Sequence, residues 1–374
     1  MYTIKLQRII LLFLIFHVSN ACNNSVHPSV KTLVLPHPLP KNIILMIGDG
    51  MGLGQITAGL YKNGNQLELE RLPYIGLQKT YSANNLITDS AAGATAFSTG
   101  YKTYNGAIAV DQDSIPLPTI VEQAEKKGLT TGIVVTSTIV HATPAAFFAH
   151  NVSRDHYEEI ALDLLDANVD IFIGGGKRYF DKRRSDNRNL IQELTDKNYR
   201  CFDLINGNLP NISNYQKNIG IFTDDSDPAT AMDGRTYLAP ATTLALDFLK
   251  NHKENGFFLM VEGSQIDWGG HANDVSYILT EMIDFDQTIG KVMDFAEKDG
   301  ETLVIVTADH ETGGFSVNLG SSMDTIVGVF NTASHTADLV PVFAYGPGAE
   351  LFSGIYENTD INIKIKKLME IIKN

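Results

Sequence analysis

The side chains of this sequence that could carry chemistry stand where runs of apolar residues end. Asp49 follows the apolar residues 43–47, inside Gly48-Asp49-Gly50-Met51-Gly52. Glu262 ends a second apolar run, and Asp309 with His310 ends a third. Open α/β sheets bind ligands at the carboxyl ends of their strands, and glycines let backbone and ligand approach closely. One such carboxylate is usually just a polar turn, but the repetition predicts a shared site.

Two further residues have the spacing of a metal-binding pair. Asp267 and His271 are four residues apart, so a helical turn would place both on one face. A carboxylate with an imidazole suits Zn²⁺, although a pair of this kind is usually only a surface hydrogen bond. The adjacent Trp268 and glycine pair favour a tight, specific turn. Together with the strand-end residues and His335, this pair provides enough ligands for more than one divalent metal. The candidates are Asp49, Glu262, Asp267, His271, Asp309, His310 and His335.

Two residues have the properties needed to handle a phosphate group. Ser90 precedes a run of small helix-forming residues, where it is either an N-cap, the commoner role, or a nucleophile at the positive end of a helix. Arg154 follows the stretch that begins at His141-Ala142-Thr143-Pro144. A guanidinium group binds two phosphate oxygens at once, although an isolated arginine is more often part of a surface ion pair.

The elements that would position these residues alternate between strands and helices. Near-continuous apolar strands predict an α/β fold, in which a mostly parallel sheet is covered by helices on both faces as a three-layer sandwich. Helical periodicity marks residues 118–127, 242–250 and 275–298. The predicted strands are residues 42–48, 76–82, 131–136, 169–173, 219–223, 257–261, 302–307 and 340–345.

The organisation along the chain predicts one large domain, residues 41–374. The sequence shows no internal repeat. Residues 182–218 are polar and rich in charge, which predicts a surface excursion and not a separate domain. Residues 315–334 have the composition of a second loop.

Composition excludes some classes of protein. The chain has 374 residues and is 44% hydrophobic, which fits a folded globular protein. Its formal net charge of −14 argues against a broad nucleic-acid-binding surface, because such surfaces need basic stripes. A local anion site remains compatible with this charge, since bound metal ions reverse the sign of a pocket.

The first residues have the pattern of an export signal. Lys5 and Arg8 precede an apolar run that is too short to span a bilayer, which predicts a signal peptide over residues 1–21. Small residues before Cys22 resemble a bacterial lipoprotein cleavage box that lacks its usual leucine; simple secretory cleavage is the alternative. A lipidated Cys22 would leave Cys201 without a disulfide partner. Residues 22–40 predict a flexible tether, and the protein is expected in the periplasm or cell envelope.

Taken in order, these motifs resemble those of the alkaline phosphatases. The resemblance covers nearly all of residues 41–350. Any one motif could arise by chance, but six in family order are very unlikely to. They are Gly48 to Gly52, Asp89 to Ala96, His141 to Pro144 with Arg154, Glu262 to His271, Thr307 to Gly314, and Ser334-His335.

The resemblance implies two zinc ions and one magnesium ion, and it assigns a role to each motif residue. Ser90 would be the nucleophile that forms a phosphoserine, and Arg154 would hold two non-bridging phosphate oxygens. The ligand sets would be Asp267, His271 and His335 for the first zinc, Asp49, Asp309 and His310 for the second, and Asp49, Thr143 and Glu262 for magnesium.

The chain departs from the family pattern at two positions beside the site. His141 and Trp268 stand where some bacterial members carry Asp and Lys, so the chain resembles a short bacterial subgroup with this His and Trp pair. His141 is expected to perturb the third metal site, and with it the preference of that site for magnesium. Trp268 cannot make the cationic phosphate contact of a lysine, which predicts a changed phosphate affinity. Residues 315–334 stand where larger relatives carry a crown-like dimer insertion, so the expected homodimer would have a small interface there.

The function expected from the resemblance is phosphate monoester hydrolysis, with release of inorganic phosphate. The nearest alternatives are a phosphodiesterase or a metal-dependent phosphomutase of the same superfamily. A different class of protein is also compatible with the motifs: a lipid-anchored protein that binds phosphate or metal without turnover. Ser90 and Arg154 favour monoesters.

Overall fold

The computed structural model describes residues 38–371, except residues 205–207, 213–217, 253–254 and 324. The described residues fall within one compact unit, Leu35–Asn374. The predicted signal peptide, Cys22 and nearly all of the predicted tether lie outside the described residues. Within the described ranges, no helix combines the length and apolar character needed to cross a bilayer.

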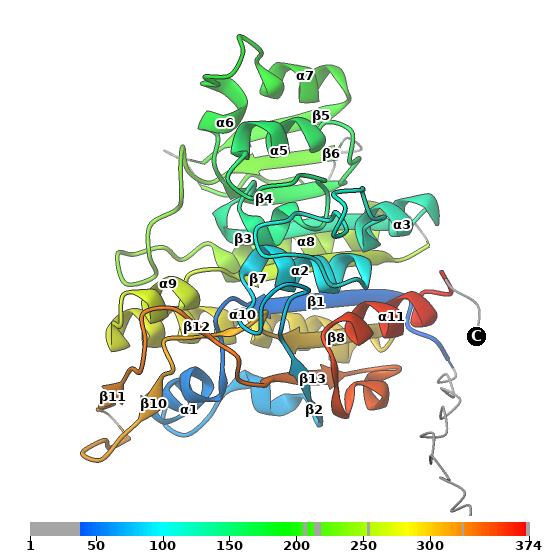
Figure 1. The fold of residues 1–374 in the computed structure, drawn as a ribbon. Helices are drawn as coiled ribbons and strands as arrows, with labels where there is room; N and C mark the ends of the chain where they lie inside the picture. Colours follow the sequence, from blue (N-terminus) through cyan, green and yellow to red (C-terminus); the bar gives the residue numbers. More distant parts are fainter. Residues whose placement is uncertain (1–37, 205–207, 213–217, 253–254, 324, 372–374) are drawn as a thin grey trace, which may run out of the picture. The chain divides into compact units, whose positions relative to one another are not determined.

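A ten-stranded sheet lies at the centre of this unit, in the order β14-β2-β13-β8-β1-β7-β3-β4-β6-β5 (Figure 1). Neighbouring strands are parallel except at β13, which runs antiparallel to both β2 and β8. The strands are β1 (Asn42–Gly48), β2 (Tyr74–Lys79), β3 (Thr130–Thr138), β4 (Ile171–Gly175), β5 (Tyr199–Asp203), β6 (Asn218–Phe222), β7 (Phe257–Gly263), β8 (Thr302–Thr307), β13 (Val340–Tyr345) and β14 (Gly354–Glu357).

The side chains of β1 alternate between two hydrophobic cores, which is why the strand is apolar throughout. Ile43, Leu45 and Ile47 belong to one core, and Ile44 and Met46 belong to the other. Helices cover both faces, so the predicted three-layer α/β fold is confirmed (Figure 1). The first core contains residues of α2 (Ser90–Thr99), α3 (Ile120–Lys126), α5 (Tyr157–Asp163), α7 (Leu190–Asp196) and α11 (Thr359–Leu368), and the second those of α1 (Leu53–Lys62), α8 (Leu238–His252) and α10 (Val275–Asp299).

Short elements connect the layers and build the edge of the sheet that carries the candidate site. Two small antiparallel ribbons, β9 with β12 and β10 with β11, lie outside the main sheet. These elements are β9 (Glu311–Thr312), β10 (Ser316–Val317), β11 (Gly328–Val329), β12 (His335–Thr336), α4 (Ala142–Ala145), α6 (Arg178–Asp181), α9 (Ile266–His271) and the 3-10 helices Glu68–Arg71 and Ala349–Phe352.

The predicted strand bounds agree best with the structure where an apolar strand is buried on both faces of the sheet. Strands β1, β8 and β13 have the predicted bounds, and β2 is shifted towards the N-terminus. The prediction that residues 182–218 form a surface excursion is wrong. This segment supplies α7, whose Leu190 and Leu194 are buried in the core, and the edge strand β5. Most charged side chains of the segment are exposed or half-buried, although that of Arg183 is only 1% exposed, and they conceal this buried apolar minority.

Candidate active site

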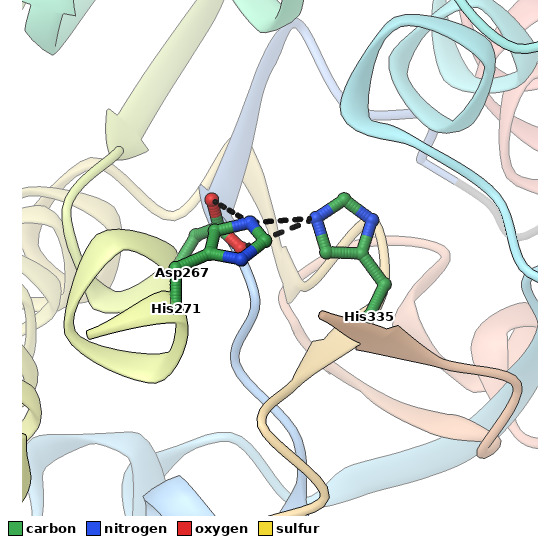
Figure 2. Close-up of side chains that lie close together, drawn as sticks. All are labelled: Asp267, His271 and His335. Carbon is green, nitrogen blue, oxygen red and sulfur yellow. Dashed lines mark hydrogen bonds and ion pairs between the residues drawn. The ribbon is translucent and has the colours of Figure 1, made fainter. Parts of the chain in front are cut away.

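The first group of candidate ligands joins α9 to the ribbon strand β12 (Figure 2). Asp267 and His271 lie one turn apart on α9, as the spacing predicted, and His335 begins β12. Nε2 of His271 lies 3.4 Å from Asp267 Oδ2 and 3.1 Å from Nε2 of His335, which is 3.5 Å from Asp267 Oδ1. Ligand atoms of one tetrahedral zinc, each about 2.0–2.2 Å from the metal, stand roughly 3.4 Å apart. The three side chains therefore fit one zinc ion.

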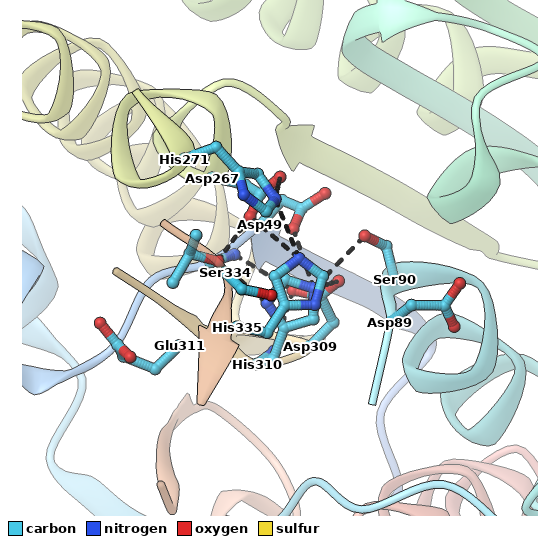
Figure 3. A network of polar contacts seen from close by, with 12 residues as sticks. Asp49, Asp89, Ser90, Asp267, His271, Asp309, His310, Glu311, Ser334 and His335 are labelled. Atoms are coloured by element: carbon cyan, nitrogen blue, oxygen red, sulfur yellow. Dashed lines mark hydrogen bonds and ion pairs between the residues drawn. The ribbon is translucent and has the colours of Figure 1, made fainter. Parts of the chain in front are cut away.

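The second group lies deeper, where β1 and β8 end side by side (Figure 3). Asp49, Asp309 and His310 are completely buried. His310 Nε2 is 3.2 Å from Asp309 Oδ2 and 3.6 Å from Asp49 Oδ1. These separations match the edges of a coordination polyhedron around a single divalent ion. The register of the parallel strands therefore brings residues 260 positions apart in sequence into one site.

The histidines of the first group are held in the tautomer that a metal requires. His271 Nδ1 lies 2.8 Å from the carbonyl oxygen of Ala333, and His335 Nδ1 lies 2.9 Å from that of Thr88. A carbonyl oxygen can only accept, so each Nδ1 carries the proton and donates. Nε2 of each ring is then an unprotonated lone-pair donor that faces the site.

A third set, Asp49, Thr143 and Glu262, lies beside the second group. Thr143 Oγ1 is 3.5 Å from Asp49 Oδ2, and Glu262 stands on β7 opposite Ile47 of β1. Ser264 and Thr143 lie beside the fully buried Glu262, but neither of its oxygens makes a hydrogen bond of normal geometry to a described residue, and nor do Asp49 Oδ1 and Asp309 Oδ2. Buried carboxylate oxygens of this kind are costly unless they coordinate a cation. The donor sets therefore fit divalent metals, with oxygen donors at the third place as magnesium prefers.

The pKa shifts of the buried carboxylates also indicate that this site binds cations. Burial, and then the neighbouring Asp309, Asp267 and Glu262, raise the pKa of Asp49 well above its ordinary range. Burial raises the pKa of Asp309, and it raises that of Glu262 to about 8. Asp309 and Asp267 oppose ionisation of both Asp49 and Glu262, so the charged forms of these two carboxylates need compensating positive charge. Bound divalent cations supply that charge and would restore the ionised, ligating forms.

The structure separates the two roles that the sequence left open for Ser90. The N-cap of α2 is Asp89, whose side chain accepts a hydrogen bond from the backbone N–H of Ala92. Ser90 is the first residue of the helix, and its Oγ lies 3.3 Å from Nε2 of His310 (Figure 3). Asp89 is as strong a cap as serine, so the Asp-Ser order could have indicated this arrangement. The Ser90 hydroxyl is thus free of the capping role and faces the second metal group.

A pocket of about 550 Å³ opens over Ser90 and the first metal group. Arg154 lines it, and its Nη1 donates to Asp89 Oδ2 at 3.1 Å. Burial lowers the pKa of the Arg154 guanidinium, but the charge and hydrogen bond of Asp89 raise it by more, so the pKa is raised overall. The pocket therefore holds a fixed cation beside a hydroxyl, a combination suited to a phosphate group.

The two unusual residues, His141 and Trp268, also line this pocket. Their rings meet edge to face, with centroids 5.9 Å apart. Burial, and then the charge of Arg154, lower the pKa of His141 to about 3, and His141 Nδ1 has no hydrogen bond to a described residue. The structure therefore brings every predicted site residue to one edge of the sheet.

The glycines around Asp49 have a different purpose from the one expected. The sequence predicts that they let a ligand approach, but protein segments occupy the space beside them. A Cβ on Gly50 would lie 2.7 Å from Cα of Asp267, and one on Gly52 would lie 2.3 Å from Cγ of Glu311. Gly50 also needs its positive φ of 72°. These glycines let the metal-bearing segments pack against the end of β1.

Glu311 is a further important residue beside the site, to which the sequence motifs assign no role. Its carboxylate accepts hydrogen bonds from Gln55 Nε2, Thr336 Oγ1 and the backbone N–H groups of Gly314 and Phe315. It therefore ties α1 to both strands of the β9–β12 ribbon. The sequence gives no local sign of this role, because its partners come from distant segments.

A Gly52→Ala substitution is expected to destabilise the protein by about 1–3 kcal/mol, because the new methyl group overlaps the fixed Glu311 side chain. Gly59→Ala is the matched control. Its Cβ would meet Met282 at an ordinary 3.4 Å inside helix α1, so it should be neutral or stabilising. Thermal unfolding of both variants tests the packing role. Equal melting temperatures for Gly52→Ala and the wild-type protein would contradict it.

Comparisons with known proteins agree with this geometry. A sequence profile described as alkaline phosphatase matches residues 40–328. Alkaline phosphatase 3 of Bacillus subtilis is 35% identical over 88% of this chain and 89% of its own length, and the Escherichia coli alkaline phosphatase is 32% identical over 87% and 85%. In its solved structure, the alkaline phosphatase from the Antarctic bacterium TAB5 is 46% identical in sequence, with a TM-score of 0.84 over 90% of this chain and 99% of that one. The chain belongs to the alkaline phosphatase family and is a phosphomonoesterase.

Proposed function

We propose that this enzyme hydrolyses phosphate monoesters in two in-line steps, through a phosphoserine on Ser90. The observation that carries the proposal is the position of Ser90 Oγ. It lies 3.3 Å from His310 of the second metal group and lines the same pocket as Arg154 and the first group. The nucleophile, the cation and the first metal group thus line one space suited to a phosphate group, and the nucleophile also contacts the buried second group.

We propose that Asp267, His271 and His335 hold one zinc ion, and that Asp49, Asp309 and His310 hold a second. When bound, the two ions supply Lewis-acid stabilisation of the attacking and leaving oxygens. Asp49, Thr143 and Glu262 would hold magnesium. Variants of the TAB5 enzyme in which one histidine is replaced by aspartate or glutamate have Mg bound in a site called M3. In this chain His141 stands two residues before Thr143, so we expect it to influence the third metal.

The chain's own residues position the reacting groups. In the first step Ser90 Oγ releases its proton to solvent and attacks phosphorus. The bond to the ester oxygen breaks, and the departing alkoxide takes a proton from solvent and leaves as the alcohol. Arg154 holds two non-bridging oxygens, and the phosphoserine forms at the first residue of α2, where the helix dipole favours negative charge. In the second step water attacks the phosphoserine, releasing inorganic phosphate and returning a proton to Ser90. Asp89 keeps Arg154 in place throughout, because it accepts from both the guanidinium and the Gly106 N–H.

The remaining proposals concern the setting of the enzyme. We propose that residues 1–21 direct export, that Cys22 carries a lipid anchor in the periplasm or cell envelope, and that residues 41–374 act as one catalytic domain. A homodimer is proposed from the family, with a short crown-like loop at residues 315–334. The ribbon of β10 and β11 lies in that loop.

Metal removal and substrate comparison test the proposed function together. The purified protein is expected to cleave an aryl phosphate monoester much faster than the corresponding diester, since the Ser90 and Arg154 pocket matches a dianionic terminal phosphate. Chelation should abolish turnover, and Zn²⁺ with Mg²⁺ should restore it. Faster cleavage of the diester would favour a phosphodiesterase. Undiminished turnover in the chelated protein would contradict the metal-dependent mechanism.

A further inference from the structure

One side chain outside the predicted ligand sets contacts a ligand of each metal group. Thr312, in strand β9, is completely buried. Its Oγ1 lies 2.5 Å from Oδ1 of Asp267, in the first group, and 3.2 Å from Nδ1 of His310, in the second. A single hydroxyl therefore stands between the two groups.

The chemistry of these three side chains fixes the direction of each hydrogen bond. The Asp267 carboxylate can only accept, so the Thr312 hydroxyl donates its proton to Oδ1. A lone pair of Thr312 Oγ1 is then available to accept from Nδ1–H of His310. This places the imidazole proton on Nδ1 and leaves Nε2, the atom near Asp49 and Asp309, as a lone-pair donor. It is the same tautomer that backbone carbonyls impose on His271 and His335.

The surrounding backbone holds Thr312 at this position. Thr312 pairs with His335 across the β9–β12 ribbon, and its N–H donates to the Gly50 carbonyl oxygen at 3.3 Å. Its own carbonyl accepts from Gln55 Nε2 at 2.7 Å. On the other side, a Cβ on Gly270 would lie 2.8 Å from the Thr312 methyl carbon, so α9 packs directly against this residue. The hydroxyl has little freedom to turn away from Asp267 and His310.

We propose that Thr312 is a positioning residue that orients Asp267 and His310 together, and so supports metal binding at both groups. The inference rests on the proposed assignment of these two groups to zinc. A hydrogen bond to the outer side of a metal ligand fixes its orientation, and loss of such a bond typically weakens metal binding 10- to 100-fold. Because one hydroxyl makes both bonds, its removal should weaken both sites at once.

The test compares hydroxyl-free and hydroxyl-bearing variants of the purified full-length protein. Chelated protein is titrated with Zn²⁺ against a competing chromophoric chelator, in saturating Mg²⁺. Thr312→Val keeps the shape of the side chain, and Thr312→Ala is a second hydroxyl-free variant in case valine prevents folding. Thr312→Ser restores the hydroxyl. Thr130→Val is the matched control, since it removes an equally buried hydroxyl that bonds to carbonyls of Leu249 and Gly256.

The expected result is that Thr312→Val or Thr312→Ala binds both zinc equivalents about 10- to 100-fold more weakly. Thr312→Ser should remain within a few-fold of the wild-type protein, and Thr130→Val should bind zinc as the wild-type does. Wild-type affinity in the hydroxyl-free variants, weakening of only one equivalent, or failure of serine to rescue would each overturn the inference. The proposed function is judged separately, by metal-dependent monoester hydrolysis in the wild-type protein.

Discussion

Ser90→Ala is expected to lower turnover of a phosphate monoester by at least about 10³-fold, as removal of an activated nucleophile does in other hydrolases. Ser90 Oγ accounts for the attack on phosphorus, and alanine has no atom to replace it. The substitution removes no metal ligand, so bound zinc and magnesium should stay near their wild-type amounts. Residual activity would come from water attacking in place of the hydroxyl, with Arg154 and the metals intact.

Steady-state kinetics and elemental analysis of the same preparation measure both halves of this prediction. Ser98→Ala is the matched control. It removes a buried hydroxyl from the same helix α2, where Ser98 Oγ bonds only to the Thr95 carbonyl among the described residues. It should leave turnover unchanged. Wild-type turnover in Ser90→Ala would remove Ser90 from the nucleophile role.

Asp49→Ala is expected to lose the second zinc and the magnesium, and activity with them. Asp49 belongs to the second group and also reaches Thr143, with Oδ1 3.6 Å from His310 Nε2 and Oδ2 3.5 Å from Thr143 Oγ1. Loss of a carboxylate shared by two ions removes a ligand from both. The first zinc should remain, because Asp267, His271 and His335 form a complete set without Asp49.

The same substitution should have opposite effects on stability with and without metals. In the chelated protein, burial and the neighbouring carboxylates make Asp49 unfavourable in its charged form, so alanine should raise the melting temperature. In the metal-loaded protein the alanine substitution should lower the melting temperature, since bound ions stabilise the fold. Asp286→Ala is the control: this buried carboxylate accepts backbone N–H groups of Glu68 and Leu69 and should affect stability but not metal content. Full metal occupancy in Asp49→Ala would contradict the bridging role.

The sequence predicted where one part of the candidate site would gather, because Asp49, Glu262 and Asp309 stand at the ends of apolar strands. Strands β1, β7 and β8 are adjacent in the sheet, so Asp49, Glu262 and Asp309 had to meet at one edge. The strand β14 could not be predicted in the same way. It is an edge strand with few buried residues, and Ile355 is 64% exposed, so no apolar run marks it.

The missing parts of the site depend on contacts between segments far apart in the chain. Thr312 lies inside a recognised motif, yet its contact with Asp267 becomes visible only when β9 packs against α9. The role of Gly52 could not be predicted for the same reason. Its lack of a side chain suggested space for a ligand, whereas the fold uses that space for Glu311. Local sequence shows that such positions are unusual, but tertiary packing determines which neighbour explains them.

Mass spectrometry of the trapped intermediate tests the proposal that a phosphoryl group passes through Ser90. The metal-loaded enzyme is mixed with excess monoester, quenched in acid, where phosphoserine is stable, and digested. The peptide containing Ser90 is expected to gain one phosphoryl group, and Ser90→Ala is expected to show no such gain. Full turnover with no phosphorylated Ser90 peptide, or phosphorylation at another residue, would contradict it.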